Sequence, residues 1–281
     1  MTAVVPQLIG GLWPNEAISG PFNGFPTGTL VGTWNYPNFA TYSTAGTYLA
    51  VFFSLQFGVE QYMYPLVPPP TFTGFTATFG GLNCSVIFEP QNPLDPNYYP
   101  PDFGGYLWEG QCFIACAIPN GYTLPNTTFT VNVQGSQLYE GFLFGDIAAG
   151  ACTNVDPAMN IATGVMTNTS TLNPSNWSMT LPAMGVPAND MVVTGYVLGS
   201  SGNTSVVSLS PSGYTLEGYH NTGAGTLIGW KVLSSPQGGS LVWSSSDSSN
   251  NISDQRASAV AFYIPVVGSL VRRRRVMQLL E

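Results

Sequence analysis

Residues 239–265, GSLVWSSSDSSNNISDQRASAVAFYIP, predict two β-strands joined by a polar, serine-rich loop. In residues 257–264, large side chains occupy alternate positions (Val260, Phe262, Ile264), and the positions between them are mostly alanine. A period of two places the large side chains on one face of a strand. The small side chains on the other face leave room for a second layer. We therefore interpret this stretch as part of a layered β-structure.

An earlier part of the chain repeats this order of strands. Residues 128–133 (TFTVNV) and 141–147 (GFLFGDI) form a similar pair. Further upstream, residues 48–57 correspond to 190–198, and residues 111–118 correspond to 226–233. The spacing between counterparts shortens after residues 89–105, which indicates one loop inserted in the first copy. The sequence therefore predicts a duplicated β-sandwich.

The composition agrees with an all-β protein. The 32 Gly and 23 Pro of the 281 residues supply turns, while 44% hydrophobic and 13% aromatic residues are enough for a substantial core. We expect an N-terminal arm and first strand over residues 1–45, a first sandwich over 46–150 and a second over 151–266. Residues 267–281 then form a C-terminal basic and apolar arm.

Charge is scarce and unevenly placed. Only 7% of residues are charged, against about 25% in a typical soluble protein. Residues 1–271 contain two cations (Lys231 and Arg256) and thirteen acids, a net charge of −11, whereas the last ten residues are net +3. An acidic body does not suit nucleic acid, which is bound through Lys and Arg. The low charge favours a subunit packed against other subunits, with a neutral Ser, Thr and Asn surface as the plainer alternative.

The sequence offers little support for catalysis, a metal or a cofactor. The four cysteines (Cys84, Cys112, Cys116 and Cys152) lack the spacing of a zinc site and are expected to be buried free thiols. His220, the only histidine, lacks a Gly-x-Ser-x-Gly elbow, so we interpret it as an exposed loop residue. Asp247 and Asp254 match a calcium loop only loosely, and a solvated hairpin loop is the better interpretation. We expect the protein not to be an enzyme.

Two surface segments are candidates for binding. Asp102, Tyr106 and Trp108 combine a carboxylate with aromatic rings, as in carbohydrate-binding sites. The plainer interpretation, which we favour, is that these rings anchor the long loop onto the sandwich or a neighbouring subunit. At the C-terminus, a basic block is followed by an apolar end (Arg272, Arg273, Arg274, Arg275, Val276, Met277, Leu279 and Leu280). We expect this arm to dock on a neighbouring subunit, with Arg pairing to carboxylates and the apolar residues filling a groove. A solvated tail and nucleic-acid contact are the alternatives.

The second copy carries a resemblance to a known group of proteins. It has an Asp-led strand at 190, a Pro-Ser-Gly-Tyr turn at 211–214, a Trp-Lys strand at 230–231, a Val-Trp-Ser-Ser-Ser-Asp strand at 242–247 and an Ala-rich closing strand. This order resembles β-sandwich modules of tailed-phage structural proteins, including minor tail and head-associated proteins. The paired arrangement is similar to tandem jelly-roll-like proteins of that group. The resemblance covers about residues 45–265 and implies a virion component.

We therefore expect an all-β chain of two tandem jelly-roll-like antiparallel β-sandwiches with extended terminal arms. The expected function is a tailed-phage virion protein of the head surface, neck or tail, assembled in the host cytoplasm. Its partners would be copies of itself and other virion proteins. One alternative is a carbohydrate-binding adhesin that contacts a host surface glycan, and another is a major capsid protein built from two jelly rolls. No apolar run reaches the ~20 residues of a membrane helix, so no membrane partner is expected.

Overall fold

The computed structural model describes residues 7–12, 17–19, 27–37, 39, 49–61, 71–88, 96–98, 106–119, 121–136, 142–153, 161–162, 176–181, 183, 185–186, 188, 191–200, 204–221, 224–247 and 255–264. These residues form antiparallel β-sheets and contain no α-helix. The all-β class expected from the turn-rich, aromatic composition is confirmed.

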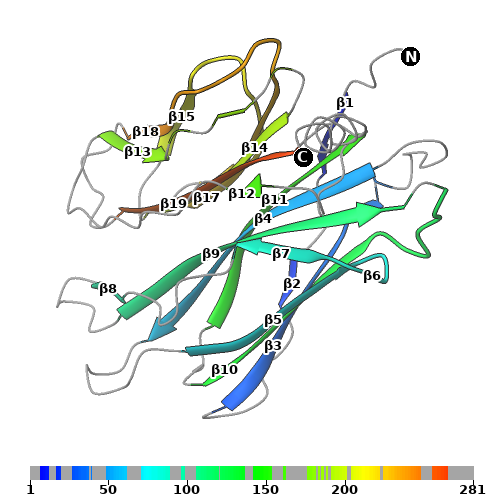
Figure 1. Ribbon diagram of the computed structural model, residues 1–281. Helices are drawn as coiled ribbons and strands as arrows, with labels where there is room; N and C mark the ends of the chain where they lie inside the picture. Colours follow the sequence, from blue (N-terminus) through cyan, green and yellow to red (C-terminus); the bar gives the residue numbers. More distant parts are fainter. Residues whose placement is uncertain are drawn as a thin grey trace, which may run out of the picture.

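The chain up to Thr153 forms two sheets that pack face to face (Figure 1). The inner sheet has the order β1 (Gln7–Leu12), β11 (Phe142–Thr153), β4 (Leu49–Gln61), β9 (Tyr106–Ile118) and β7 (Ser85–Phe88), with β8 (Pro96–Tyr98) also paired to β9. The outer sheet has the order β2 (Ala17–Ser19), β3 (Thr27–Asn35), β10 (Thr128–Ser136), β5 (Thr71–Phe79) and β6 (Leu82–Asn83). We call this pair of sheets the first sandwich.

The rest of the described chain forms a second pair of sheets. Its inner sheet has the order β12 (Ile161–Ala162), β19 (Gln255–Ile264), β14 (Met191–Ser200), β17 (Ala224–Val232) and β16 (Thr215–Asn221). Its outer sheet has the order β13 (Asn176–Leu181), β18 (Leu241–Asp247) and β15 (Thr204–Ser210). The strands matched in the sequence occupy equivalent places, since β4, β9 and β11 lie in the first inner sheet as β14, β17 and β19 lie in the second.

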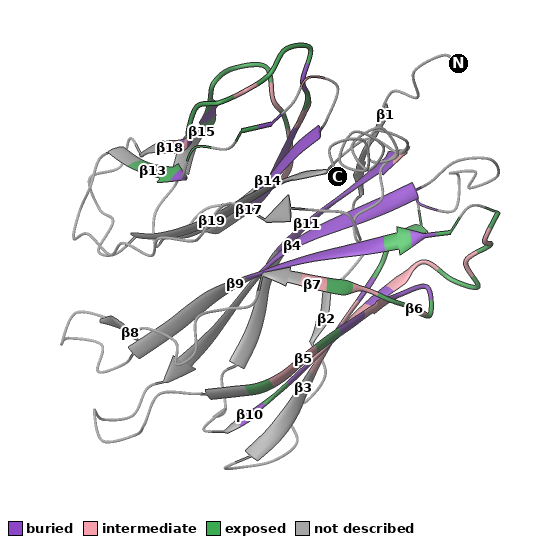
Figure 2. Cartoon of the chain, in the orientation of Figure 1, coloured by how far each residue is buried: buried purple, intermediate pink, exposed green. Residues whose placement is uncertain are grey.

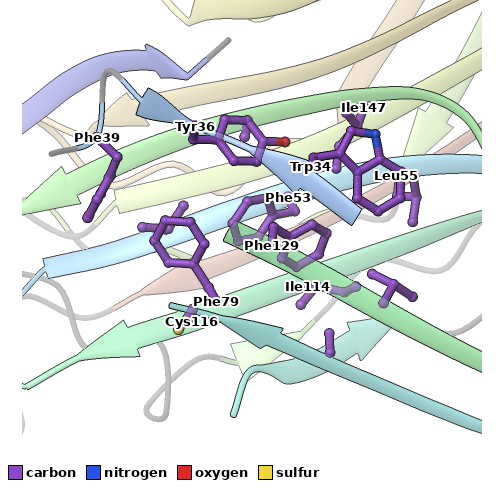
Figure 3. Close-up of a cluster of buried hydrophobic side chains, with 14 of the residues drawn as sticks. Trp34, Tyr36, Phe39, Phe53, Leu55, Phe79, Ile114, Cys116, Phe129 and Ile147 are labelled. Carbon is purple, nitrogen blue, oxygen red and sulfur yellow. The ribbon is translucent and has the colours of Figure 1, made fainter. Parts of the chain in front are cut away.

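Aromatic side chains fill the core of the first sandwich (Figure 3). Phe53 of the inner sheet stacks on Phe129 of the outer sheet, with ring centroids 3.8 Å apart. The rings of Tyr36 and Phe79 also pack against Phe53, with centroids 5.7 and 5.5 Å from the Phe53 centroid. Because these residues come from both sheets, burying them is what holds the two layers together.

The second core uses fewer but equally buried aromatic residues. Tyr196 of the inner sheet stacks on Trp243 of the outer sheet at 4.9 Å. The indole N–H of Trp243 donates a 2.9 Å hydrogen bond to Thr194 Oγ1, so neither polar group is buried without a partner. Leu181, Leu209, Leu227, Leu233 and Leu241 complete this core.

Residues 1–45 contribute more β-strands to the sheets than their glycine and proline content predicts. We expected an arm and one strand, but β1 pairs with β11, and β2 pairs with β3. None of the five prolines of this segment (Pro6, Pro14, Pro21, Pro26 and Pro37) falls within β1, β2 or β3 as the structure bounds them. Proline cannot donate a ladder hydrogen bond, so it breaks this segment into short strands rather than excluding it from the sheets.

The two closing strands do not form a hairpin, which corrects the interpretation of residues 247–254. β18 lies in the outer sheet and β19 in the inner sheet, so the chain crosses from one layer to the other. The same crossing joins β10 to β11 in the first sandwich, where Val131 and Ile147 meet in one core. Placing the two strands in opposite layers lets the chain cover a core from both sides.

Candidate functional site

The inner sheets of the two sandwiches pack against each other through a third apolar cluster. The first sandwich contributes Ala50, Phe52, Phe113, Ala115, Ala148 and Cys152, and the second contributes Met191, Val193, Ile228 and Trp230. All ten side chains are at most 2% exposed. This surface is as deeply buried as the interior of either sandwich. Apolar contacts of this kind are typical of permanent interfaces.

Strand β4 shows how the sequence builds this interface. Leu49, Val51, Phe53 and Leu55 face the first core, while Ala50 and Phe52 face the second sandwich. Residues 49–55 of β4 are therefore buried on both faces, and Figure 2 shows the same for most of the described residues of β9 and β11. A strand covered on both sides is expected to be apolar throughout. The run LAVFF at 49–53 has this property.

Trp230 of β17 and Gly150 of β11 make a close contact between the sandwiches. A Cβ atom at Gly150 would overlap the Cη2 and Cζ3 atoms of the Trp230 ring. Only glycine leaves the space that the indole fills. The Trp230 side chain is 2% exposed, and its Nε1 has no acceptor among the described residues. The contact is therefore one of shape and apolar area, not of hydrogen bonding.

A small polar cluster fixes the turn that follows β15. Lys231 Nζ donates a 2.8 Å hydrogen bond to the Ser212 carbonyl and lies 5.4 Å from the ring centroid of Tyr214. Tyr214 Oη donates to Gln237 Oε1 at 3.2 Å. Burial raises the pKa of Tyr214 to about 12, partly offset by the hydrogen bond to Gln237. The cluster ties the turn at 211–214 to β17 and to the loop before β18, which is a structural role.

The four cysteines are free thiols, as expected. Cys112, Cys116 and Cys152 are buried and Cys84 is partly buried. Cys112 and Cys116 both face the first core, so the prediction that they share one face of a strand is confirmed. Burial raises the pKa of Cys152 well above its usual value. A hydrogen bond with Cys116, together with burial, does the same for the pKa of Cys84. Thiols in this state are poor nucleophiles.

The predicted docking arm lies outside the described residues. This applies to all of its members: Arg272, Arg273, Arg274, Arg275, Val276, Met277, Leu279 and Leu280. Its role stays a prediction.

Of the candidate carbohydrate residues, Asp102 lies outside the described part and the other two lie on β9. Tyr106 pairs in backbone register with Gln61 and Tyr98, and Trp108 with Val59 and Pro96. The start of β9 is thus held between two strands. No described contact joins these residues into a binding site.

His220 belongs to a strand and not to a loop, which corrects its interpretation. It lies in β16 and pairs with Gly225 across the β16–β17 hairpin. Asp247 ends β18 opposite Thr204, and Asp254 lies outside the described residues. Within the described ranges, no three His, Cys, Asp or Glu side chains come together as a metal site requires.

Sequence reasoning missed the surface that joins the two sandwiches. The signal was present in residues 147–152 (IAAGAC), where four consecutive small residues lie within an apolar strand. Small residues at alternate positions of 257–264 had suggested that a second layer approaches closely. The sequence did not say that this layer is the other sandwich, or that Trp230 is the side chain that enters.

No protein-family model, curated protein or solved structure matches this chain. In the part of the chain that the structure describes, no helix has the length and apolar character needed to cross a lipid bilayer.

Proposed function

We propose that this protein is a structural subunit of a virus particle, formed by two jelly rolls that act as one block. The observation that carries the proposal is the fusion of two similarly ordered sandwiches through the apolar interface of Gly150 and Trp230. Repeating shells and tubes need rigid subunits, because a flexible joint would let neighbouring contacts vary. The proposal assigns the chain no catalytic role and no cofactor.

The strand order supports the jelly-roll part of the proposal. Numbering β1, β3, β4, β5, β6, β9, β10 and β11 from one to eight gives an inner order of 1-8-3-6 and an outer order of 2-7-4-5. This is the order produced by two Greek keys wound into one sandwich. In the second sandwich, the equivalent strands give 1-8-3-6 for β12, β19, β14 and β17, and 2-7-4 for β13, β18 and β15.

The proposal also concerns where in the particle the subunit lies. A shell subunit built from two jelly rolls draws support from the matched strand orders. A place on the head surface, neck or tail of a tailed phage draws support from the resemblance of residues 45–265 to such modules. We favour the shell, because a second sandwich of matching order serves a subunit that must present similar surfaces on two sides. No described contact favours the carbohydrate-binding alternative.

Two measurements test the proposal. Purified full-length protein is examined by native mass spectrometry and electron microscopy, and we expect closed assemblies with a fixed copy number. In the second measurement, purified virus particles from the organism that encodes this chain are analysed by mass spectrometry. We expect this chain at high copy number if it forms the shell. A chain that stays monomeric at high concentration and is absent from particles would show that the proposal is wrong.

The C-terminal arm is tested separately, because it concerns how copies attach and not what they are. We expect a chain ending at residue 266 to fold normally but to incorporate poorly into particles. A matched variant with Arg272, Arg273, Arg274 and Arg275 all changed to Gln separates the basic block from the apolar end. Normal incorporation of the truncated chain would contradict the docking role.

A further inference from the structure

The outward faces of the two outer sheets are built almost entirely of short uncharged polar side chains. In the first sandwich, Thr33, Thr130 and Thr78 are aligned across β3, β10 and β5, with Val31, Asn132 and Thr76 in the next row. These side chains are exposed or half-buried, while their neighbours along the strands point into the core. We call this surface the first outer face.

The second sandwich has an equivalent surface. Ser178, Ser244 and Ser208 are aligned across β13, β18 and β15, and Thr180, Val242 and Ser210 form the next row. All six are exposed or half-buried. We call this surface the second outer face.

Ionisable residues avoid these two sheets. As the structure bounds them, the strands of the first outer sheet contain no Asp, Glu, Lys or Arg, and those of the second contain only Asp247 at the end of β18. The other charged residues of the described strands all belong to the inner sheets: Glu60, Glu109, Asp146, Glu217, Lys231 and Arg256. This distribution is unusual, because an exposed sheet normally carries charges of both signs on its solvent side.

Electrostatics favours a second copy of the chain as the occupant of these faces. Residues 1–271 carry a net charge of −11, so two copies repel each other wherever their carboxylates meet. At physiological salt, this repulsion is screened beyond about 8 Å, and the residues at the contact itself therefore decide whether copies can associate. A face without ionisable residues meets an acidic neighbour without burying a charge or opposing like charges.

The chemistry of the faces disfavours other ligands. Their described outward residues include no aromatic side chain on which a sugar ring could stack. They include no cation that could bind phosphate, as nucleic acid requires. Threonine and serine have short side chains and lose little conformational entropy when a neighbour packs against them.

The two faces lie at opposite ends of a stack of four layers, outer, inner, inner and outer (Figure 1). The inner sheets already cover each other. A contact between the first outer face of one copy and the second outer face of the next would use both remaining surfaces. A contact between two first outer faces would require a separate contact between two second outer faces, whereas the head-to-tail arrangement covers both faces with one kind of contact.

We infer that the first outer face of one copy packs on the second outer face of the next, so that the four-layer blocks repeat head to tail. Repeated contacts of this kind close into a ring when a whole number of the rotations between neighbouring copies makes a full turn. Otherwise they form an open array. This inference rests on the proposed function and adds to it the surfaces through which the subunits meet.

Charge placed on each face tests the inference. Thr76→Lys and Ser208→Glu each add one charge at an exposed position. We expect either variant alone to need a protein concentration ~10-fold or more higher than wild type to assemble, because one unpaired charge is buried at each contact. Mixing the two variants is expected to restore assembly. Native mass spectrometry should then show mixed assemblies with equal numbers of each. Alternation of the two variants pairs Lys with Glu at every second contact and leaves the contacts between them as in wild type, so no added charge is buried unpaired.

Matched variants control for the charge itself. Thr123→Lys and Ser235→Glu add the same charges at exposed positions outside both faces, and we expect wild-type assembly from each. Circular dichroism and the unfolding midpoint show that all variants fold. A mixture of Thr76→Lys with Thr76→Glu should not restore assembly, and restoration in that mixture would overturn the head-to-tail pairing.

The remaining outcomes separate this inference from the proposed function. A wild-type chain that stays monomeric contradicts the proposed function, and the inference falls with it. Wild-type-like assembly of both Thr76→Lys and Ser208→Glu overturns the inference alone. Binding of wild type to a glycan array, lost in either variant without any effect on assembly, would assign the face to a sugar and would also overturn it.

Discussion

Trp230 of the second sandwich packs its six-membered ring against the backbone of Gly150 in the first. A side chain at position 150, even a single methyl group, would occupy the space of the Cη2 and Cζ3 atoms. The two residues lie on the facing strands β11 and β17. Their contact sets how closely the inner sheets approach, and the first predictions follow from it.

Gly150→Ala is expected to lower the free energy of unfolding by about 1–3 kcal/mol, the usual cost of overpacking a close-packed interior. Urea unfolding followed by tryptophan fluorescence measures this change. Gly185→Ala is the matched control, because a Cβ there meets nothing within 4 Å. Equal stability of the Gly150→Ala and Gly185→Ala variants would contradict the close approach.

Trp230→Ala is expected to cost about 3–5 kcal/mol, since it leaves a cavity between the inner sheets. Trp230→Phe should cost less, because it retains an aromatic ring and removes an indole N–H that has no acceptor among the described residues. In a double-mutant cycle of Gly150→Ala with Trp230→Ala, the two losses should not add. Additive losses would show that the two residues act independently.

The free energy of unfolding should fall between pH 10 and pH 12, in part because of Tyr214. Its pKa is about 12 in the folded protein and about 10 in an unfolded chain. In this range the unfolded chain has released a proton that the folded chain retains, so raising the pH favours unfolding. Urea titrations at several pH values should show a shallower fall for Tyr214→Phe. A slope equal to that of wild type would contradict the burial of this hydroxyl.

Tyr36 provides an internal comparison for this alkaline effect. Burial raises the pKa of its phenol well above the usual value, and its hydroxyl has no hydrogen-bond partner among the described residues. Tyr36→Phe should therefore also reduce the alkaline slope. At neutral pH it should cost little or even stabilise the protein, because it removes an unsatisfied buried group.

Lys231→Met is expected to destabilise the turn at 211–214 by about 0.5–1.5 kcal/mol. The substitution removes the hydrogen bond to the Ser212 carbonyl and the contact with the Tyr214 ring, but keeps most of the side-chain length. Thermal unfolding measures the loss, and hydrogen exchange of the turn amides should rise locally. If only global exchange rises, the lysine does not act on the turn.

The thiols should react slowly with Ellman's reagent in the folded protein and rapidly in urea. Cys112, Cys116 and Cys152 are buried, and a thiolate is the reactive form. A Cys84→Ser variant should show the slowest reaction of all, because Cys84 is the one partly buried thiol among the four. Rapid reaction of three or more thiols in native buffer would contradict the described core.

Much of the fold was predictable from strand-length apolar runs and period-two patterns. The apolar run at 49–57 predicted β4, the run at 190–198 predicted β14, and the similar order of strands in the two halves indicated a duplication. Such runs are readable because a strand covered on both sides is apolar throughout, while one covered on one side is apolar on alternate residues. The shared faces of Cys112 and Cys116 followed from the same rule.

Other features were not readable, because they depend on residues far apart in sequence. The pairing of 241–247 with 255–264 as a hairpin was wrong, since neighbours in sequence can belong to opposite layers when both have a core to cover. His220 looked like a loop residue, because its Gly and Asn neighbours are typical of turns. Backbone pairing with Gly225 instead holds it in β16.

The sequence by itself determined the β class, the repeated order of strands and the scarcity of charge, because each of these is written in local pattern or composition. Only the tertiary structure decided that the inner sheets join through Gly150 and Trp230, and that the uncharged sheets are left facing outward. A strand's pattern shows that a face is buried, but not by what. The identity of the covering layer depends on shape and on contacts between distant residues.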